Sequence, residues 1–321
     1  MVKLKMKIRC GMFEGGICHV KITQTFAQIG RRFLFRGDFM ETNILKAIYN
    51  LKKYSNNNFE EIYRGKNRAN IMGEALEYYV KDLFCDCLRE KSVDEKGKAY
   101  SKYFSYIGNQ NNPPDFIISK GDAVEVKKIE GIGGIALNSS YPKSKLYSES
   151  GMITQACKDC EQWKIKDIIY SIGTVNNSSL KLLWMVYGDC YAASSEVYER
   201  VRNKISGGVN ELPGVEFSET NELGRVNKVD PLGITYLRIR GMWGIEHPNK
   251  VFNYAVKYDK SKKFRLFALM KEEKYNSFPN ADREAIEGLK GKSFLISNIE
   301  IKSPDNPAKL MPAKLIQFSI D

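Results

Sequence analysis

The chain has 321 residues, of which 43% are hydrophobic, so it can bury a full core as one large domain or as a core with an appended lobe. No apolar run approaches the ~18 residues of a membrane span, and the basic N-terminus lacks the unbroken apolar segment of a signal peptide. These features argue against membrane and secreted proteins and predict a cytoplasmic one, while the net charge of +12 favours a polyanionic partner.

Residues 1–39 contain eight Lys or Arg against two acidic residues, so they contribute half of the net charge, +6. Their glycines interrupt any sustained period. We expect a weakly structured basic extension on which function does not depend, and Met40 is an alternative start. Seven cysteines, an odd number without the spacing of a disulfide framework, indicate a reduced interior.

Two helices are predicted next, over residues 43–54 and from about 67 to 90. The second carries a sustained amphipathic stripe from Ile71 to Cys87. On a helical wheel the centre of this stripe lies roughly 125° from Glu77 and roughly 180° from Glu74. Glu77 therefore flanks the buried face, whereas Glu74 points away from it.

A hairpin is predicted around residues 112–129. Two short apolar strands, 116–118 and 123–129, flank the polar turn Ser119–Asp122, and two prolines precede Asp115. Side chains alternate along a strand, so Glu125 and Lys127 share one face, close to Asp115 on the neighbouring strand.

Two carboxylates and a lysine at one sheet edge are what metal-assisted phosphodiester cleavage requires. Asp115 and Glu125 offer the hard oxygen ligands that Mg²⁺ prefers, and Lys127 can orient a water molecule or help to deprotonate it. The alternative is an ordinary surface hairpin with a Glu-Lys pair, because so short a pattern arises by chance.

The polar loop that follows contains Ser139, Ser140 and Lys143, which could donate hydrogen bonds to phosphates. A helix over 152–163, core strands over 167–175 and 180–187, and a helix over 194–205 are predicted beyond it. Cys157 and Cys160 could be half of a zinc site, although packing of two thiols explains the pair as well.

We expect residues 213–258 to recognise the DNA sequence. In the predicted strand 236–240, Arg238 and Arg240 share a face with Tyr236, and a guanidinium fork suits guanine O6 and N7. A solvated strand face with arginines in surface ion pairs is the alternative. A strand, a helix and two strands are predicted over 264–270, 282–289, 293–301 and 315–320 as a C-terminal lobe.

Several segments closely resemble the NgoPII family of type II restriction endonucleases. They are residues 104–115, 121–130, 137–143, 160–163, 221–225, 230–232 and 240–245. The resemblance extends from about Glu41 to about residue 275, so chance similarity is an unsatisfactory explanation. Residues 1–39 match nothing in the family.

This resemblance implies an α/β fold, an α+β mixed sheet with the αβββαβ core of PD-(D/E)xK nucleases in residues 40–210, and a recognition and C-terminal lobe in residues 211–321. It implies that Asp115, Glu125 and Lys127 form the catalytic triad, with the two carboxylates as Mg²⁺ ligands. It makes Glu77 a candidate fourth acidic group and Arg225 a further candidate for DNA contact. The implied target is double-stranded DNA at the palindrome GGCC.

A palindromic target favours a two-fold dimer, and a restriction enzyme implies a cognate DNA methyltransferase. Two other functions compete with this prediction. A repair or recombination nuclease would share the core but read DNA structure, which the likeness around residues 225–245 disfavours. A non-cleaving DNA-binding protein would not need the complete set of Asp115, Glu125 and Lys127.

Overall fold

The structure, a computed structural model, describes residues 39–63, 68–90, 92–109, 112–211, 216–218 and 222–321. The sequence predicts an extension over residues 1–39, and all of it except Phe39 lies outside this range. Residues 39–321 form one compact unit. Within the described residues, no helix combines the length and the apolar character that crossing a membrane would require.

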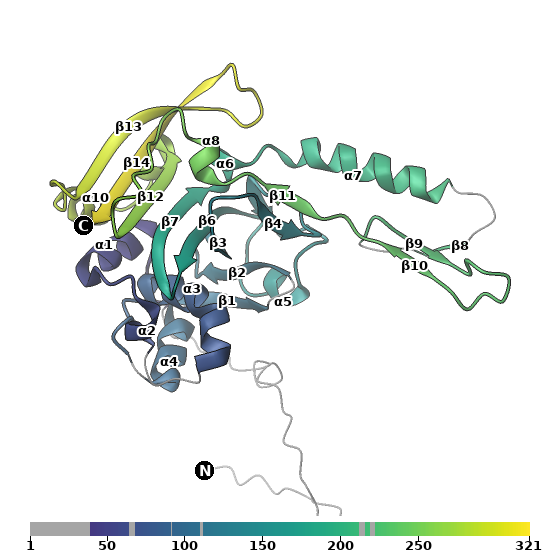
Figure 1. Ribbon diagram of the computed structural model, residues 1–321, viewed down its shortest axis with the longest axis horizontal. Helices are drawn as coiled ribbons and strands as arrows, with labels where there is room; N and C mark the ends of the chain where they lie inside the picture. The colour runs from purple at the N-terminus through teal and green to yellow at the C-terminus, as the bar shows by residue number, and fades with distance from the viewer. Residues whose placement is uncertain (1–38, 64–67, 91, 110–111, 212–215, 219–221) are drawn as a thin grey trace, which may run out of the picture. The chain divides into compact units, whose positions relative to one another are not determined.

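A nine-stranded mixed sheet forms the centre of this unit (Figure 1). Its strands follow the order β1-β2-β3-β6-β7-β12-β14-β13, and the short β5 pairs with the start of β6. β3 runs parallel to β6 and β7 runs parallel to β12, whereas the other neighbours are antiparallel. The strands are β1 (Phe104–Asn109), β2 (Asn112–Ile118), β3 (Ala123–Ile129), β5 (Lys145–Tyr147), β6 (Ile165–Asn176), β7 (Ser179–Tyr187), β12 (Phe264–Lys271), β13 (Phe294–Lys302) and β14 (Leu310–Ile320).

Ten helices accompany the sheet in the described part of the chain, several of them single turns. They are α1 (Ile44–Tyr54), α2 (Phe59–Ile62), α3 (Arg68–Phe84), α4 (Val93–Tyr103), α5 (Gln155–Lys158), α6 (Gly188–Tyr191), α7 (Ser195–Asn210), α8 (Pro248–Val251), α9 (Glu272–Asn276) and α10 (Asn280–Glu287). The elements follow each other as α3-α4-β1-β2-β3-β4-β5-α5-β6, so the αβββαβ order that the family resemblance implies is found only when α4 and the short strands β4 and β5 are set aside.

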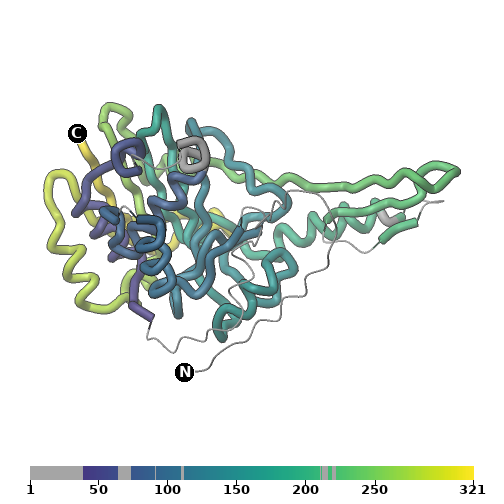
Figure 2. The backbone as a smooth tube through the Cα atoms, turned by 90° about the horizontal axis from the view of Figure 1, so that it is seen from below, coloured from purple at the N-terminus to yellow at the C-terminus, as the bar shows by residue number. Residues whose placement is uncertain are grey.

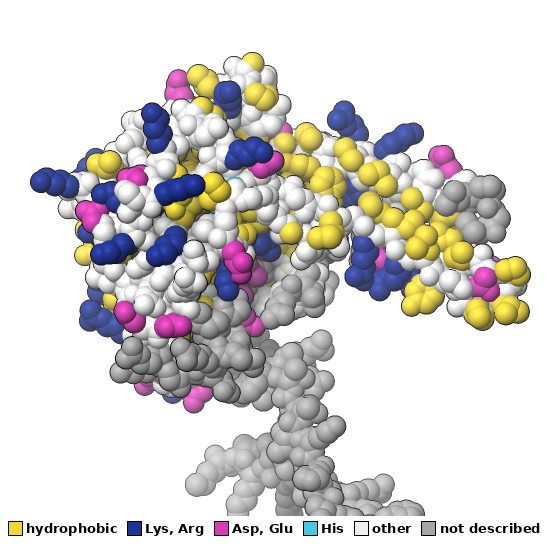
Figure 3. All heavy atoms as spheres, in the orientation of Figure 1, with side chains coloured by type: hydrophobic (Ala, Val, Ile, Leu, Met, Phe, Trp, Pro, Cys, Tyr) yellow, Lys and Arg dark blue, Asp and Glu magenta, His cyan; other side chains and the backbone are white. Residues whose placement is uncertain are grey.

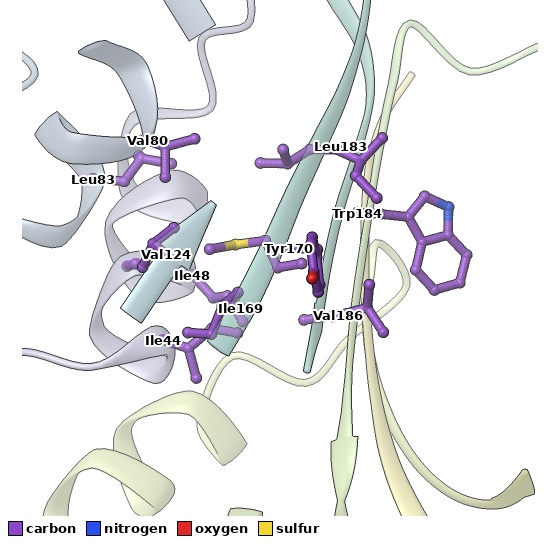
Figure 4. Close-up of a cluster of buried hydrophobic side chains, with 14 of the residues drawn as sticks. Ile44, Ile48, Val80, Leu83, Val124, Ile169, Tyr170, Leu183, Trp184 and Val186 are labelled. Carbon is purple, nitrogen blue, oxygen red and sulfur yellow. The ribbon is translucent and has the colours of Figure 1, made fainter. Parts of the chain in front are cut away.

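Helix α1 shows how the sequence builds the core. The Asn43 side chain accepts hydrogen bonds from the N–H groups of Leu45 and Lys46 and so caps the helix. Apolar side chains then recur along one buried face. Figure 4 shows Ile48 of α1 gathered with side chains of α3, β3 and β6 in one apolar cluster. Each fully buried side chain of this kind contributes roughly 1.5–3 kcal/mol.

Most predicted elements are present with small shifts in their bounds, but two predictions were wrong. The helix expected over 152–163 is reduced to α5, because Thr154 caps a single turn and the Trp163 indole then donates to the carbonyl of Cys157. The helix expected to reach residue 90 ends at Phe84. Asp86 adopts a left-handed φ of 51°, which a continuing helix cannot accommodate.

The strands predicted near the C-terminus are all present, and they extend the central sheet. β12 pairs with β7, and β14 and β13 follow it, so segments on both sides of residue 210 share one sheet. The buried carboxylate of Asp122, which directly precedes β3, accepts hydrogen bonds from Tyr187 at 2.6 Å and Lys274 at 2.7 Å. The C-terminal part of the chain therefore helps to fix the start of β3.

A three-stranded sheet lies apart from the central one, in the order β10-β9-β8. Its strands are β8 (Glu216–Phe217), β9 (Gly224–Asn227) and β10 (Leu237–Ile239). Together with α7 they project from the central sheet (Figures 1 and 2), and we call the described residues between 195 and 242 the arm. At its base β11 (Trp243–Ile245) pairs with β4 (Ile135–Asn138), shortly after β3 in the chain.

Candidate active site

The β2–β3 hairpin brings Asp115, Glu125 and Lys127 together as the sequence predicts. Phe116 lies opposite Val124 in the antiparallel ladder, which sets the register. The Val126 N–H donates to Asp115 Oδ2 at 2.5 Å, so the Asp115 carboxylate lies across the middle of the Glu125–Lys127 segment. Lys127 Nζ forms an ion pair with Glu125 Oε1 at 2.6 Å.

The two carboxylates repel each other in a poorly solvated place. Burial, and then the charge of Glu125, raise the pKa of Asp115 to about 8, with a smaller contribution from Glu77. Burial by itself would lower the pKa of Lys127, but Glu125, Asp115 and Glu77 raise it above its ordinary value. A cation added here would relieve the repulsion between Asp115 and Glu125.

One carboxylate oxygen has the environment of an unused metal ligand. Glu125 Oε2 is buried and has no hydrogen-bond partner among the described residues, although a buried polar atom without one is costly. Asp115 supplies the second carboxylate. No group of three or more His, Cys, Asp or Glu that could hold a metal is found in the described part of the chain. Asp115 and Glu125 are the carboxylates that line the cavity there. Such a pair suits Mg²⁺, which retains several waters and takes substrate oxygens as further ligands.

A cavity of about 100 Å³ opens in front of these residues. Asp115, Glu125 and Lys127 form one side, and the loop after β4 forms another with Ser139, Ser140, Tyr141 and Lys143. Tyr170 of β6 and the polar side chains Asn109, Asn112 and Asn138 also line it. The predicted phosphate-binding loop thus faces the predicted triad.

Lys143 is the second lysine of this cavity. Its side-chain Nζ donates to Ser140 Oγ at 2.7 Å and lies 4.8 Å from the centre of the Tyr141 ring. Its backbone N–H donates to the Tyr170 hydroxyl at 2.7 Å. Only 6% of the residue is exposed, and this burial lowers the pKa of Lys143 to about 8 even though Glu125 and Glu199 act in the opposite direction. The site therefore holds an ammonium group that gains from an arriving phosphate.

Glu77 lies at the margin of the site. Its carboxylate accepts a hydrogen bond from Lys81 at 2.9 Å, one turn further along α3. It does not line the cavity, but its charge acts on the pKa values of both Asp115 and Lys127. Burial, and then the charge of Glu74, raise the pKa of the neighbouring Tyr78. The charge of Glu77 therefore reaches Asp115 and Lys127, and its part in cleavage stays a prediction.

Three aromatic rings join the arm to the cavity. Tyr141 of the cavity loop stacks on Tyr198 of α7, with ring centres 5.4 Å apart and planes 17° apart. Trp243 of β11 packs edge-on against both rings, at 5.9 and 5.8 Å. Each such pair contributes about 0.5–1.5 kcal/mol beyond its buried area. Tyr198 near the start of the arm and Trp243 directly after its end thus both rest on the loop that carries Lys143.

The predicted DNA-contacting arginines gather on the arm. Arg238 and Arg225 lie opposite each other on β10 and β9. Arg238 binds the Glu222 carboxylate through two nitrogens, at 2.6 and 3.0 Å, and Arg240 reaches the same carboxylate at 2.6 Å. Arg225 lies over the Tyr236 ring at 4.9 Å. The guanidinium groups are therefore oriented within the arm, and about half of the Arg238 and Arg240 side chains stays exposed.

Sequence reasoning missed Tyr170, Tyr198 and Trp243. Tyr170 lies in a correctly predicted strand, but its role depends on the parallel pairing of β3 with β6, which no local pattern indicates. Trp243 lies in a segment that carries the family resemblance, and this was the available signal for it. Tyr198 had none.

Comparisons with known proteins identify the family of this chain. A family model described as NgoPII restriction endonuclease matches residues 42–302, which include Asp115, Glu125 and Lys127. The type II restriction enzyme NgoPII of Neisseria gonorrhoeae is 48% identical over 280 residues, covering 87% of this chain and 100% of that enzyme. No solved structure matches the chain. The chain therefore belongs to the NgoPII restriction endonuclease family.

Proposed function

We propose that this chain is a type II restriction endonuclease with a PD-(D/E)xK site that cuts double-stranded DNA at GGCC and uses Mg²⁺. One observation carries the proposal: Asp115, Glu125 and Lys127 meet at the edge of a small polar cavity, with a buried oxygen of Glu125 unpartnered within the described chain. The family membership supports the reaction class.

In this proposal Asp115 and Glu125 hold the metal. Bound Mg²⁺ supplies a Lewis acid for phosphate oxygens and lowers the pKa of a coordinated water. Lys127, already held by Glu125, orients the attacking water at the open side of the cavity. Lys143 and Ser140 donate to the non-bridging oxygens of the phosphate, so that positive charge lies where negative charge accumulates. Glu77 tunes Asp115 and Lys127 through its charge.

We assign recognition of the DNA sequence to the arm. Arginine forks on guanine O6 and N7 are the commonest specific contacts in the major groove, and GGCC offers two guanines per strand. Glu222 holds Arg238 and Arg240 side by side, which lowers the entropy lost when the forks meet adjacent bases. Arg225 is a third candidate.

Cutting both strands of a palindrome calls for two equivalent sites, so we propose a homodimer. A cell that contains such an enzyme must protect its own sites, which implies a partner DNA methyltransferase of the same specificity.

Digestion of plasmid DNA followed by sequencing of the new ends tests the proposal. Every end should fall at one position within GGCC, and cutting should stop in EDTA and return with Mg²⁺. Ends at unrelated sequences, or cutting that continues in EDTA, would contradict it.

A further inference from the structure

Tyr170 of β6 lies beside the Glu125 carboxylate. In the parallel pairing of β3 with β6, Tyr170 is the register partner of Glu125. Partners in a ladder place their side chains on the same face of the sheet, and both residues line the active-site cavity. The phenol ring of Tyr170 therefore stands next to the Glu125 carboxylate at the cavity wall.

The hydroxyl of Tyr170 has a partner for its oxygen but not for its hydrogen. The oxygen accepts a hydrogen bond from the backbone N–H of Lys143 at 2.7 Å. A phenol also has one hydrogen to donate, and no acceptor for it is found among the described residues. Only 3% of Tyr170 is exposed, and a buried donor without an acceptor is costly. An acceptor that enters the cavity would satisfy this donor.

The hydroxyl keeps its hydrogen at neutral pH. Burial raises the pKa of Tyr170 above its ordinary value, although the hydrogen bond from Lys143 acts in the opposite direction. The charge of Glu125 raises this pKa further. The Tyr170 hydroxyl is therefore a neutral hydrogen-bond donor and not a nucleophile or a base.

Two neighbouring buried groups of opposite kind thus lack a partner within the described chain. Glu125 Oε2 can accept and the Tyr170 hydroxyl can donate, yet the two are not hydrogen-bonded to each other. A phosphodiester that enters with a metal ion supplies what each group lacks. The carboxylate gains a cation, and the hydroxyl gains a phosphate oxygen as its acceptor.

The hydroxyl of Tyr170 also supports the loop that carries Lys143, but this loop has other supports. A Cβ added at Gly188 of α6 would lie only 2.3 Å from the Lys143 carbonyl oxygen, so the loop is in close contact with that helix. Lys145, two residues further along, forms an ion pair with Asp167 of β6. The position of the loop therefore does not depend on the Tyr170 hydroxyl alone.

Burial restricts which phosphate Tyr170 can reach. Lys and Arg side chains are spread over the body and the arm (Figure 3), where they can contact phosphates along a bound DNA. Tyr170 has no such access, because it is buried and borders the cavity. It can meet only a phosphate that enters the cavity beside Asp115, Glu125 and Lys127.

We propose that Tyr170 is a further catalytic residue, whose hydroxyl donates a hydrogen bond to a non-bridging oxygen of the phosphate that is cut. The contact strengthens as this oxygen gains negative charge in the transition state. The hydroxyl keeps its hydrogen throughout, so the contact stabilises charge and transfers no proton. This inference rests on the proposed cleavage of DNA, and it adds a neutral donor to those of Lys143 and Ser140.

Single-turnover cleavage of a GGCC duplex by Tyr170→Phe in Mg²⁺ tests the proposal. The variant keeps the ring and loses only the hydroxyl. Its cleavage rate should fall on the order of 100-fold. Its affinity for the same duplex in Ca²⁺ should change far less, because the contact strengthens only in the transition state.

Tyr191→Phe is the matched control. Tyr191 is also buried, packs edge-on against Tyr170 with ring centres 5.8 Å apart, and donates its hydroxyl hydrogen to the Glu246 carbonyl. It does not line the cavity. Tyr191→Phe therefore loses a buried hydrogen bond of the same kind, and it should cut like the wild type.

Sulfur in place of a non-bridging oxygen of the cut phosphate separates a direct contact from support of the loop. Sulfur accepts hydrogen bonds more weakly than oxygen, so sulfur at the contacted position should slow the wild type. The same sulfur should slow Tyr170→Phe about 10-fold less. Only one of the two phosphorothioate diastereomers should show this difference. The ratio of the rates on the two substrates does not depend on how much of the variant is folded.

An unchanged cleavage rate in Tyr170→Phe would overturn the proposal, and so would an equal loss in Tyr191→Phe. Sulfur effects equal to those of the wild type for both diastereomers would also overturn it and leave the hydroxyl only a role in holding the loop. A wild type that does not cut GGCC duplexes contradicts the proposed function itself. A wild type that cuts while Tyr170→Phe keeps its full rate contradicts only this inference.

Discussion

Lys143→Met should make the protein more stable and less active. The lysine is 6% exposed, and burial lowers its pKa from 10.5 to about 8. A difference of about 2.5 between the unfolded and folded pKa values corresponds to about 3 kcal/mol, which the fold loses by holding this side chain charged. Methionine has a similar length and carries no charge. It gives up the hydrogen bond to Ser140, which contributes about 1 kcal/mol, so a net gain of about 2 kcal/mol remains.

The gain in the free energy of unfolding of Lys143→Met should decrease as the pH rises. The folded pKa of Lys143 is depressed, so between about pH 8 and pH 10.5 the folded chain binds fewer protons than the unfolded chain. Stability contributed by this residue therefore rises with pH across that window, and the full penalty applies below pH 8. Lys143→Met should thus be about 2 kcal/mol more stable than the wild type at pH 7, and the difference should shrink as the pH approaches 10.

Urea denaturation of both proteins at pH 7 and pH 10 measures this effect. The exposed Lys128→Met is the matched control and should change the free energy of unfolding by less than about 0.5 kcal/mol. Cleavage by Lys143→Met should fall, because the cavity loses a cation that faces the phosphate. A variant less stable than the wild type at pH 7, or a gain that does not shrink toward pH 10, would refute this reasoning.

Four further predictions concern other parts of the chain. Glu77→Gln should cut more slowly than Glu74→Gln in single-turnover assays, because the charge of Glu77 raises the pKa of both Asp115 and Lys127; equal cleavage rates would make the helix merely structural. Arg238→Lys keeps the charge but removes the guanidinium fork, so discrimination against one wrong base pair should fall by about 1–3 kcal/mol in competition binding with Ca²⁺. An unchanged ratio of the affinities for GGCC and mismatched duplexes would place recognition elsewhere. Tyr198→Leu should reduce the cleavage rate more than DNA affinity, because it removes the stacking between α7 and the cavity loop, and parallel losses would argue against that link. A chain starting at residue 40 should fold and cut normally, with weaker non-specific DNA binding because +6 of charge is absent, and an inactive truncation would contradict this.

The sequence predicted what local patterns determine. The Asn43 cap and the apolar spacing after it define α1, and the β-branched runs around a polar turn define the hairpin that carries Glu125. Alternation along β3 was enough to place Glu125 and Lys127 beside Asp115. The wrong helix over 152–163 shows the limit of periodicity, because a side-chain cap and a tertiary hydrogen bond from Trp163 close the turn instead.

The side of the cavity that carries Lys143 depends on contacts between segments far apart in the chain. Lys143 faces the triad because β6 pairs with β3 and carries Tyr170 to the loop backbone. Trp243 reaches Asn138 through pairing of β11 with β4, across more than one hundred residues. Such pairings leave no local sequence pattern.

If the β2–β3 hairpin holds the cutting site, the neighbouring lysines Lys127 and Lys128 must differ sharply in what they contribute to cleavage. Lys127 pairs with Glu125 in the cavity, whereas Lys128 is exposed outside it. Single-turnover cleavage of a GGCC duplex in Mg²⁺ should be abolished in Lys127→Met and unchanged in Lys128→Met, with both variants folded and binding DNA. Full cutting by folded Lys127→Met, or equal loss in both variants, would contradict the assignment of the site.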